Sequence, residues 1–162
     1  MKGYEAMGIS LYKPDLSEMG FRRELLADED TMSYNAHWGG AIDFPEEDWE
    51  GWYSHWLINT DARRFYRYIK DDEMGEFVGE AAYHIDTDSS RCLADVIVHS
   101  RFRNRGIGTA ALGLLCKAAK ENGVDVICDN IAKDNPGISL FIKNGFTEEY
   151  RDDEIIMLRK EL

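Results

Sequence analysis

A strand-to-helix turn that is both basic and rich in glycine constrains the fold of this chain more than any other feature. Residues 98–111 read VHSRFRNRGIGTAA, in which three arginines fall within five residues and Gly106 and Gly108 precede a helical apolar pattern. Glycine lets backbone N–H groups approach a ligand closely, and the first turn of a helix carries free N–H groups with partial positive charge. The turn is therefore predicted to bind phosphate, although the chain as a whole has a net charge of −12.

The length and composition indicate one globular domain, residues 1–162, in a soluble and cytoplasmic protein. No apolar run approaches the roughly 20 residues of a membrane helix, and the first residues lack the apolar core of a signal peptide. The three cysteines have no metal-ligand spacing, so we expect reduced thiols and no metal site. The negative net charge argues against nucleic acid as a partner, because phosphates would be repelled.

The hydrophobic pattern predicts a mixed α/β fold with one antiparallel region and one βαβ crossover. The expected order of elements is β-α-α-β-β-β-α-β-α-β-β. Strands are expected at residues 8–13, 64–70, 76–85, 92–98, 124–128, 146–150 and 155–158. Helices are expected at residues 16–26, from Pro45 onward, from the glycines to the Asn122-Gly123 pair, and at 136–143. Residues 28–44 have the pattern of a loop or a broken helix.

Two other phosphate-binding patterns match the turn less well. Residues 106–111 fit the dinucleotide pattern G-x-G-x-x-A, and Asp129 follows about 20 residues later, at the end of the next expected strand. A dinucleotide fold, however, places its first glycine close to the end of the strand and needs two βαβ halves. Here seven residues separate Val98 from Gly106, and only 54 residues follow Gly108. The lysine of a Walker A loop is absent.

Residues 98–108 resemble the acetyl-CoA site of the GNAT N-acetyltransferases. The signature of that site is Arg or Gln, any two residues, Gly, any one residue, and then Gly or Ala. Arg103, Gly106 and Gly108 occupy its defined positions. Residues 134–146, DNPGISLFIKNGF, resemble the family's N-x-x-A-x-x-x-Y-x-K-x-G-F region. The resemblance covers about residues 60–162. It implies a GNAT-like mixed, mostly antiparallel sheet flanked by helices, with residues 61–162 as the acetyl-CoA-binding half and residues 1–60 as the acceptor half.

The resemblance implies an acyltransferase that moves an acetyl group directly from acetyl-CoA, its cosubstrate, to an amine of a small molecule or peptide. The alternative is a catalytically silent acyl-CoA-binding sensor or regulatory module. A homodimer is left open, and neither a membrane nor nucleic acid is expected as a partner. The residues implied in coenzyme binding are Val96, Val98, Arg103, Asn104, Arg105, Gly106, Ile107, Gly108, Thr109, Asn135, Ser139, Phe141 and Lys143.

Phe141 departs from the family pattern, because most members carry a tyrosine there that can protonate the departing thiolate. The segment is also one residue shorter between Asn135 and Leu140. A thiolate is a tolerable leaving group, since the thiol pKa is near ~8.5. We therefore expect Ser139, Tyr150 or a water molecule to replace the usual acid.

Acetyl transfer also needs a proton acceptor, because an alkylamine of pKa near ~10.4 is almost entirely protonated at neutral pH. Asp95 is the first candidate, since it lies on the strand that leads to the glycine turn, and Glu80 on the neighbouring strand is the second. For both, a solvated or paired carboxylate is the structural alternative. The resemblance implies that the amide of Val98 or of a neighbour polarises the thioester carbonyl.

The first 60 residues are expected to form the acceptor site. They contain all four tryptophans, twelve acidic residues and four basic residues, a composition suited to a cationic amine. Tyr34, His37 and Trp38 lie in an irregular stretch and are the candidates for substrate binding. The tryptophans of residues 49–56 have helical spacing, which is also typical of packing against a sheet. Polyamine, aminoglycoside, amino acid and protein N-terminus all remain open as acceptors.

Overall fold

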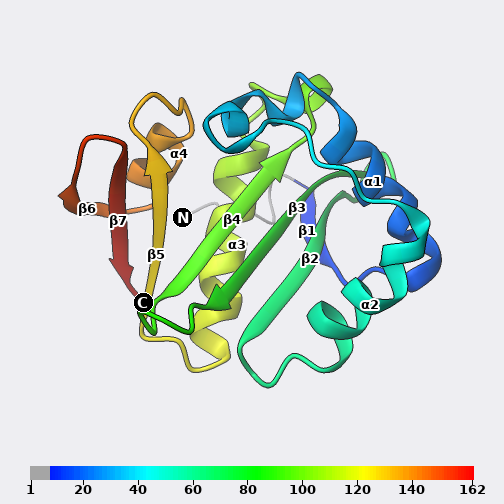
Figure 1. Cartoon of the computed structure of the whole chain (residues 1–162), viewed down its shortest axis with the longest axis horizontal. Coiled ribbons are helices and arrows are strands. Elements are labelled where there is room, and N and C mark those ends of the chain that lie inside the picture. The colour runs from blue at the N-terminus through cyan, green and yellow to red at the C-terminus, as the bar shows by residue number, and fades with distance from the viewer. Residues whose placement is uncertain (1–7) are drawn as a thin grey trace.

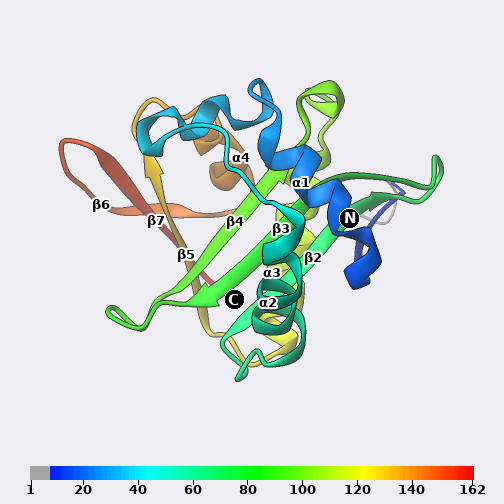
Figure 2. The same ribbon diagram turned by 45° about the vertical axis from the view of Figure 1, so that its right-hand side comes forward.

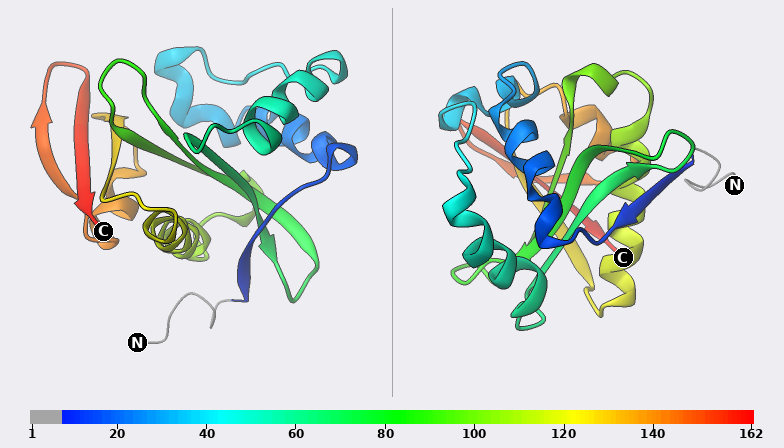
Figure 3. Two further views of the ribbon diagram at one scale, coloured as in Figure 1. Left: turned by 90° about the horizontal axis from the view of Figure 1, so that it is seen from below. Right: turned by 90° about the vertical axis from the view of Figure 1, so that its right-hand side faces the viewer.

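The computed structural model describes residues 8–162 and shows a seven-stranded sheet with helices on both faces (Figures 1 and 3). The strands lie in the order β1-β2-β3-β4-β5-β7-β6. They are β1 (Ile9–Tyr12), β2 (Arg64–Asp71), β3 (Glu76–Ile85), β4 (Cys92–Val98), β5 (Val126–Ala132), β6 (Thr147–Arg151) and β7 (Ile155–Glu161). Every neighbouring pair is antiparallel except β4 and β5, which are parallel. The predicted mixed, mostly antiparallel fold is therefore confirmed.

Helices cover the two faces of the sheet in separate groups. The elements before the sheet's central strands are η2 (Leu16–Glu18), α1 (Met19–Ala27), η3 (Thr31–Trp38), η4 (Glu46–Asp48), α2 (Trp49–Tyr53) and η5 (Ser54–Ile58). Those after them are η6 (Ser100–Phe102), α3 (Ile107–Glu121) and α4 (Ile138–Lys143). Figure 3 shows α1 and α2 on one side of the sheet and α3 on the other. Each group seals its own apolar core, and burial of such side chains is the main favourable term in folding.

The register of the central strands decides which side chains share a face. Tyr66 on β2 lies opposite Ala82 on β3, and Ala82 lies opposite Asp95 on β4. Glu80 lies two residues before Ala82 and therefore points to the same side. The two carboxylates that the sequence proposes as bases thus lie on one face, the face covered by α1 and α2.

Strands β4 and β5 pair only at their amino-terminal ends. The paired residues are Cys92 with Ile127 and Leu93 with Cys128. Beyond that point the strands separate toward their carboxyl ends (Figure 1). The 3-10 segment η3 lies over this opening, near α4, as the view in Figure 2 also shows. A parallel pair that splays open leaves unpaired backbone and space for a ligand between its strands.

Several predicted boundaries are wrong. The strand expected at residues 124–128 begins at Val126 and continues to Ala132, because β5 pairs with β7 along its whole length. Asp129 is therefore an interior strand residue, not a strand end. Pro45 has extended backbone and caps the short helix η4 without belonging to it. Helix α4 begins at Ile138, two residues later than expected. The expectation that the chain lacks a signal peptide falls largely on residues 1–7, outside the described residues.

Candidate active site

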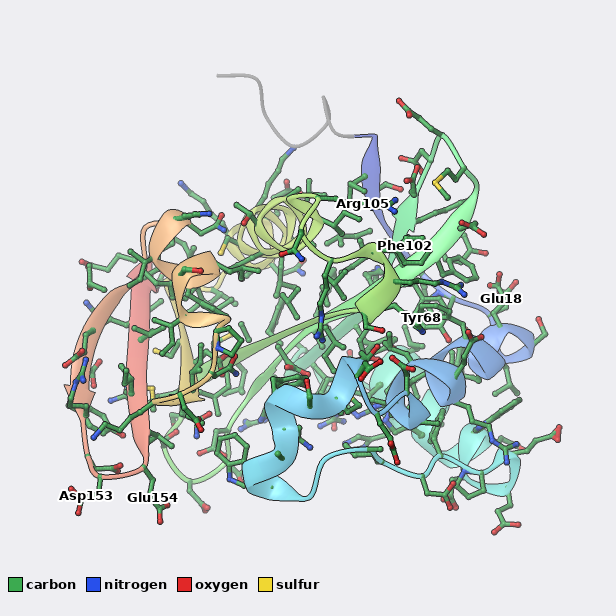
Figure 4. All side chains as sticks on the ribbon, turned by 90° about the horizontal axis from the view of Figure 1, so that it is seen from above. Glu18, Tyr68, Phe102, Arg105, Asp153 and Glu154 are labelled. Carbon is green, nitrogen blue, oxygen red and sulfur yellow. The ribbon has the colours of Figure 1, made fainter. Side chains whose placement is uncertain are left out.

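Two cavities open on the sheet where β4 and β5 separate. The larger cavity, of about 790 Å³, lies between the ends of these strands, the turn before α3, and α4. The predicted coenzyme-binding residues that line it are Val96, Val98, Arg103, Asn104, Gly106, Ile107, Gly108, Thr109, Asn135, Ser139, Phe141 and Lys143. Arg105 is not among the lining residues. Its guanidinium lies 5.7 Å from the centre of the Phe102 ring, on the turn between β4 and α3 (Figure 4).

The glycine turn has the backbone that anion binding requires. Gly106 caps α3 in the left-handed conformation, with φ of +79°, which a residue with a Cβ rarely adopts. The N–H of Ala110 donates to the carbonyl of Gly106 at 3.1 Å, so the amides of residues 107–109 precede the helical ladder. Gly108 also packs closely on α4, because a Cβ there would overlap Cδ1 of Leu140 and the Leu140 side chain would have to shift.

The side chain of Arg103 binds protein carbonyls. Its Nε donates to the carbonyl of Val98 at 3.3 Å, its Nη1 to that of Asp30 at 3.2 Å, and its Nη2 to that of Thr31 at 2.5 Å. The guanidinium therefore joins the end of β4 to the start of η3. Contact between Arg103 and phosphate stays a prediction, and the structure adds a second role for this side chain.

A carboxylate makes a second link between the same two segments. Oδ2 of Asp28 accepts hydrogen bonds from the Thr31 hydroxyl at 2.5 Å and from the Ser100 hydroxyl at 2.8 Å. The amide of Ser100 in turn donates to the Thr31 hydroxyl at 2.9 Å. These bonds, that from Thr31 first, lower the pKa of Asp28 to about 2. The position of η3 over the strand opening is thus held from both sides.

The smaller cavity, of about 470 Å³, lies on the α1 and α2 face and meets the larger one. Six residues line both cavities, and we call their site the junction: Tyr34, Asp95, Ile97, Asp129, Ile131 and Asn135. Asp95 comes from β4, Asp129 from β5 and Tyr34 from η3. A ligand in one cavity can meet a ligand in the other only at the junction.

The two aspartates of the junction both resist ionisation. Burial at the base of the cavities raises the pKa of Asp95 to about 7, with a further contribution from the negative charge of Glu80. Water reaches this carboxyl through the cavity and screens part of the effect. Burial, followed by the charge of Asp95, raises the pKa of Asp129 well above its ordinary value. Near neutral pH the junction therefore holds a carboxyl poised to exchange a proton.

Glu80 is buried and already paired. It accepts a hydrogen bond from the hydroxyl of Tyr66, and its Oε1 lies 3.3 Å from Nε of Arg22. The guanidinium of Arg22 packs 4.1 Å from the ring centre of Trp52 and 4.5 Å from that of Phe44. These contacts match the paired carboxylate that the sequence analysis names as the alternative for Glu80. Its role as a base stays a prediction.

The predicted acceptor residues lie at different depths. Tyr34 reaches the junction, and burial followed by the charge of Asp95 raises its pKa, so its hydroxyl keeps its proton. Trp38 lines the smaller cavity and is 52% exposed. The side chain of His37 lies outside the part of the chain that the structure describes. Roles for all three in substrate binding stay predictions.

Sequence reasoning missed three residues that line the smaller cavity. Asp129 was considered only as a dinucleotide-binding residue, because the strand that carries it was expected to end before it. Trp52 and Trp56 were expected to pack against the sheet, and they do pack on Tyr66, while also lining the cavity. Their helical spacing was the available signal, but it does not tell a wholly buried face from one that borders a cavity.

Phe141 is buried and lines the larger cavity. Its ring packs edge-on against Phe146, with centres 5.0 Å apart. Ser139 lines the same cavity, whereas Tyr150 lies on β6, is 45% exposed and is not among the residues that line either cavity. Among the three expected replacements for the family's tyrosine, Tyr150 is thus the least well placed.

Residues 8–162 contain no group of three or more histidine, cysteine or acidic side chains arranged to hold a metal ion. In the same range, no helix has both the length and the apolar character needed to cross a membrane.

The chain matches the family model of the acetyltransferase (GNAT) family over residues 23–146. Its fold is similar to that of spermidine N-acetyltransferase from Vibrio cholerae, solved with CoA and spermine, at a TM-score of 0.75 and 16% identity over 95% of each chain. It is also similar to that of a putative acetyltransferase from Salmonella typhimurium solved with acetyl-CoA, at a TM-score of 0.71 and 15% identity over 96% of this chain and 94% of that chain. An acetyltransferase of the GNAT family from Bacillus anthracis has a similar fold, at a TM-score of 0.74 and 17% identity over 94% of each chain.

Proposed function

Since the chain belongs to the GNAT acetyltransferase family, we propose that it transfers the acetyl group of acetyl-CoA to the nitrogen of an amine at the junction. The observation that carries this proposal is the meeting of two cavities at the ionisable side chains of Asp95 and Asp129. The larger cavity takes the coenzyme and the smaller one takes the amine. The acyl group and the nucleophile then come together beside a proton acceptor.

The larger cavity has features that suit a pyrophosphate with a long flexible arm. The amides of residues 107–109 at the start of α3 offer donors to phosphate oxygens, and α3 is long enough to contribute its dipole. The separation of β4 from β5 leaves backbone groups that can pair with the amides of an extended arm. GNAT structures solved with CoA or acetyl-CoA support this assignment by their similar fold.

The proton chemistry falls to the junction. The acceptor arrives as an ammonium ion, and Asp95 accepts one proton from it, directly or through water, before or as the nitrogen attacks the thioester carbon. A carbon–nitrogen bond forms and the carbon–sulfur bond breaks, with its electron pair leaving on sulfur. A second proton then moves from the tetrahedral nitrogen to solvent by way of the carboxyl pair. The pKa of Asp95, raised to about 7, suits a group that gains and loses a proton near neutral pH.

The leaving thiolate lacks the usual tyrosine, because position 141 is phenylalanine. Tyr34 offers a protonated hydroxyl at the junction, and Ser139 offers one in the larger cavity. Since a thiolate whose conjugate thiol has a pKa near ~8.5 leaves without strong acid assistance, water is also sufficient.

Three free, buried cysteines, Cys92, Cys116 and Cys128, support the expectation of a reducing compartment such as the cytoplasm.

The test combines coenzyme binding with acceptor-dependent chemistry. Calorimetry should detect acetyl-CoA binding to the wild-type protein and a large loss of affinity in Gly106→Glu, which places a carboxylate at the amides before α3. Release of free CoA thiol should require an amine, and mass spectrometry should find the acetylated product. Tight binding of acetyl-CoA without acetylation of any amine in a broad panel would instead identify a silent acyl-CoA-binding module.

A further inference from the structure

We propose that the acceptor is a primary amine with a single positive charge on a flat, apolar body, as in an arylalkylamine. This inference rests on the proposed acetyl transfer and adds the chemical class of its acceptor. It follows from where the smaller cavity carries charge and where it carries aromatic surface. The nitrogen lies at the junction, and the apolar body lies against a wall formed by Trp38, Ile42, Trp52 and Trp56, which we call the outer wall.

Among the described residues that line the smaller cavity, the carboxyl groups outside the Arg22–Glu80 ion pair belong to the junction. The acidic lining residues of this cavity are Glu80, Asp95 and Asp129, and the last two belong to the junction. The charge of Glu80 is matched by the hydrogen bond from Tyr66 and by Arg22, which is the one lysine or arginine among the described residues that line this cavity. An arriving ammonium ion favours the ionised form of a neighbouring carboxyl, so its attraction is strongest at Asp95 and Asp129, where the amine must lie for acetyl transfer.

The outer wall presents aromatic and aliphatic surface. Trp52 and Trp56 stack with ring centres 6.0 Å apart and an interplanar angle of 25°. Trp38 is 52% exposed and Ile42 is 46% exposed, so both leave apolar surface accessible at the cavity. Aromatic planes favour an offset or edge-on contact with another ring, so a flat apolar group suits this wall.

The polar groups near the outer wall do not favour a second charge. Apart from the Arg22–Glu80 pair and the Tyr66 hydroxyl bonded to it, the described lining residues outside the junction that carry an amide or imidazole are Asn35, His84 and Asn130, and none of them is an acid. The acidic residues of the η4 and α2 region, Glu46, Glu47, Asp48 and Glu50, are exposed and line neither cavity. No described acidic residue among the first 60 positions lines either cavity, so the composition that suits a cationic amine does not supply carboxylates to the cavity wall.

Two common acceptor classes are disfavoured by this distribution. The second ammonium group of a polyamine would leave water for the outer wall, where the cation of Arg22 already packs on Trp52 and pairs with the carboxylate of Glu80. The carboxylate of a free amino acid would lie next to its amine, close to Asp95 and Asp129, where like charges repel. An amine carried on an uncharged ring meets neither cost. The cavity volume of about 470 Å³ lies in the range of sites for small molecules.

The experiment compares four amines that differ by one feature each, with kcat/KM measured by thiol release. The reference is 2-phenylethylamine, n-butylamine lacks the ring, phenylalanine adds a carboxylate, and 1,4-diaminobutane replaces the ring by a second ammonium group. We expect 2-phenylethylamine to exceed each of the others by at least ~10-fold. Trp38→Ala should reduce kcat/KM more for 2-phenylethylamine than for n-butylamine.

A matched control is Met74→Ala, because Met74 is exposed to the same extent as Trp38 but lies in the turn between β2 and β3, away from both cavities. It should leave the order of the four amines unchanged. Faster acetylation of 1,4-diaminobutane or phenylalanine, or an equal effect of Trp38→Ala on both monoamines, would overturn the inference while leaving acetyl transfer intact. If none of these amines, nor a peptide N-terminus, is acetylated by protein that binds acetyl-CoA, the proposed function itself fails.

Discussion

Nη2 of Arg103 lies 2.5 Å from the carbonyl oxygen of Thr31, so the turn that precedes α3 directly holds the segment that carries Tyr34. The two residues are 72 positions apart in the chain. Their contact joins the turn that lines the larger cavity to η3, the segment that carries the junction residue Tyr34. A residue that the sequence pattern assigns to phosphate alone thus also holds η3, which carries part of the proposed acceptor site.

Arg103→Ala is expected to weaken acetyl-CoA binding and to raise KM for the amine, because it removes three bonds to the carbonyls of Val98, Asp30 and Thr31. KM for the amine should rise at least several-fold, because Tyr34 lies on η3 and η3 is held by Arg103. Calorimetry and steady-state kinetics measure the two effects separately. Arg105→Ala is the control, because Arg105 lines neither cavity and should leave KM for the amine unchanged.

Asp95→Asn is expected to reduce turnover by roughly 10²-fold near pH 7–8 while coenzyme affinity barely changes. The wild-type rate should rise with pH through about 7, where Asp95 loses its proton, and the variant should lack this rise. Above pH 8 the difference should shrink, because more of the amine is already neutral. Rates against pH for Asp95→Asn and Glu80→Gln, measured side by side, check this. Wild-type turnover by Asp95→Asn at pH 7 would exclude Asp95 as the base.

Asp95→Asn is also expected to make the folded protein more stable than the wild type at pH 8. The pKa of Asp95 is higher in the folded chain, about 7, than the ordinary value of 3.8, so ionising this carboxyl costs stability as pH rises from about 4 through 7. Asparagine removes that cost, whereas at pH 4 both side chains are neutral and stability should be similar. Thermal unfolding at the two pH values measures this. A variant that is less stable at pH 8 would indicate a structural role for Asp95.

Phe141→Tyr is expected to leave acetyl-CoA affinity within a few fold and to leave turnover unchanged or raised. Phe141 lines the larger cavity, so an added hydroxyl can extend into that space. Phe146→Tyr is the contrasting variant, because Phe146 is 2% exposed and lines neither cavity. Its buried hydroxyl should cost about 1–3 kcal/mol of stability. A collapse of coenzyme binding in Phe141→Tyr would mean that position 141 does not border the coenzyme.

Gly79→Ala is expected to destabilise the fold by at least ~2 kcal/mol and to weaken coenzyme binding. A Cβ at Gly79 would overlap the backbone carbonyl of Ile97, so the ends of β3 and β4 would have to separate next to Val98. Gly51→Ala is the control, because nothing lies within 4 Å of its added Cβ and α2 should gain up to ~1 kcal/mol. Denaturant unfolding gives both free energies, and equal effects of the two changes would refute this account.

The sequence by itself determined the class of fold and the position of the glycine turn before α3. Three consecutive segments rich in aromatic or β-branched residues and separated by short polar turns predict a meander, because strands so close in sequence pair antiparallel. The glycines and the helical pattern after Val98 specify a strand, a turn and a helix start, because Gly106 needs a positive φ that few other residues adopt. These are local requirements, and local requirements can be read from neighbouring residues.

The tertiary structure alone decided which distant residues share the junction. Asp129 belongs to it because β7 pairs with β5 beyond Cys128, and because β5 separates from β4 after a short parallel contact. Tyr34 belongs to it because Arg103 and Asp28 hold η3 over that opening. Strand pairing and loop closure join residues that are dozens of positions apart, and no local propensity encodes those distances. Desolvation by the residues gathered at the junction, followed by the charge of Glu80, then raises the pKa of Asp95 to about 7, whereas its residue type alone would place it near 4.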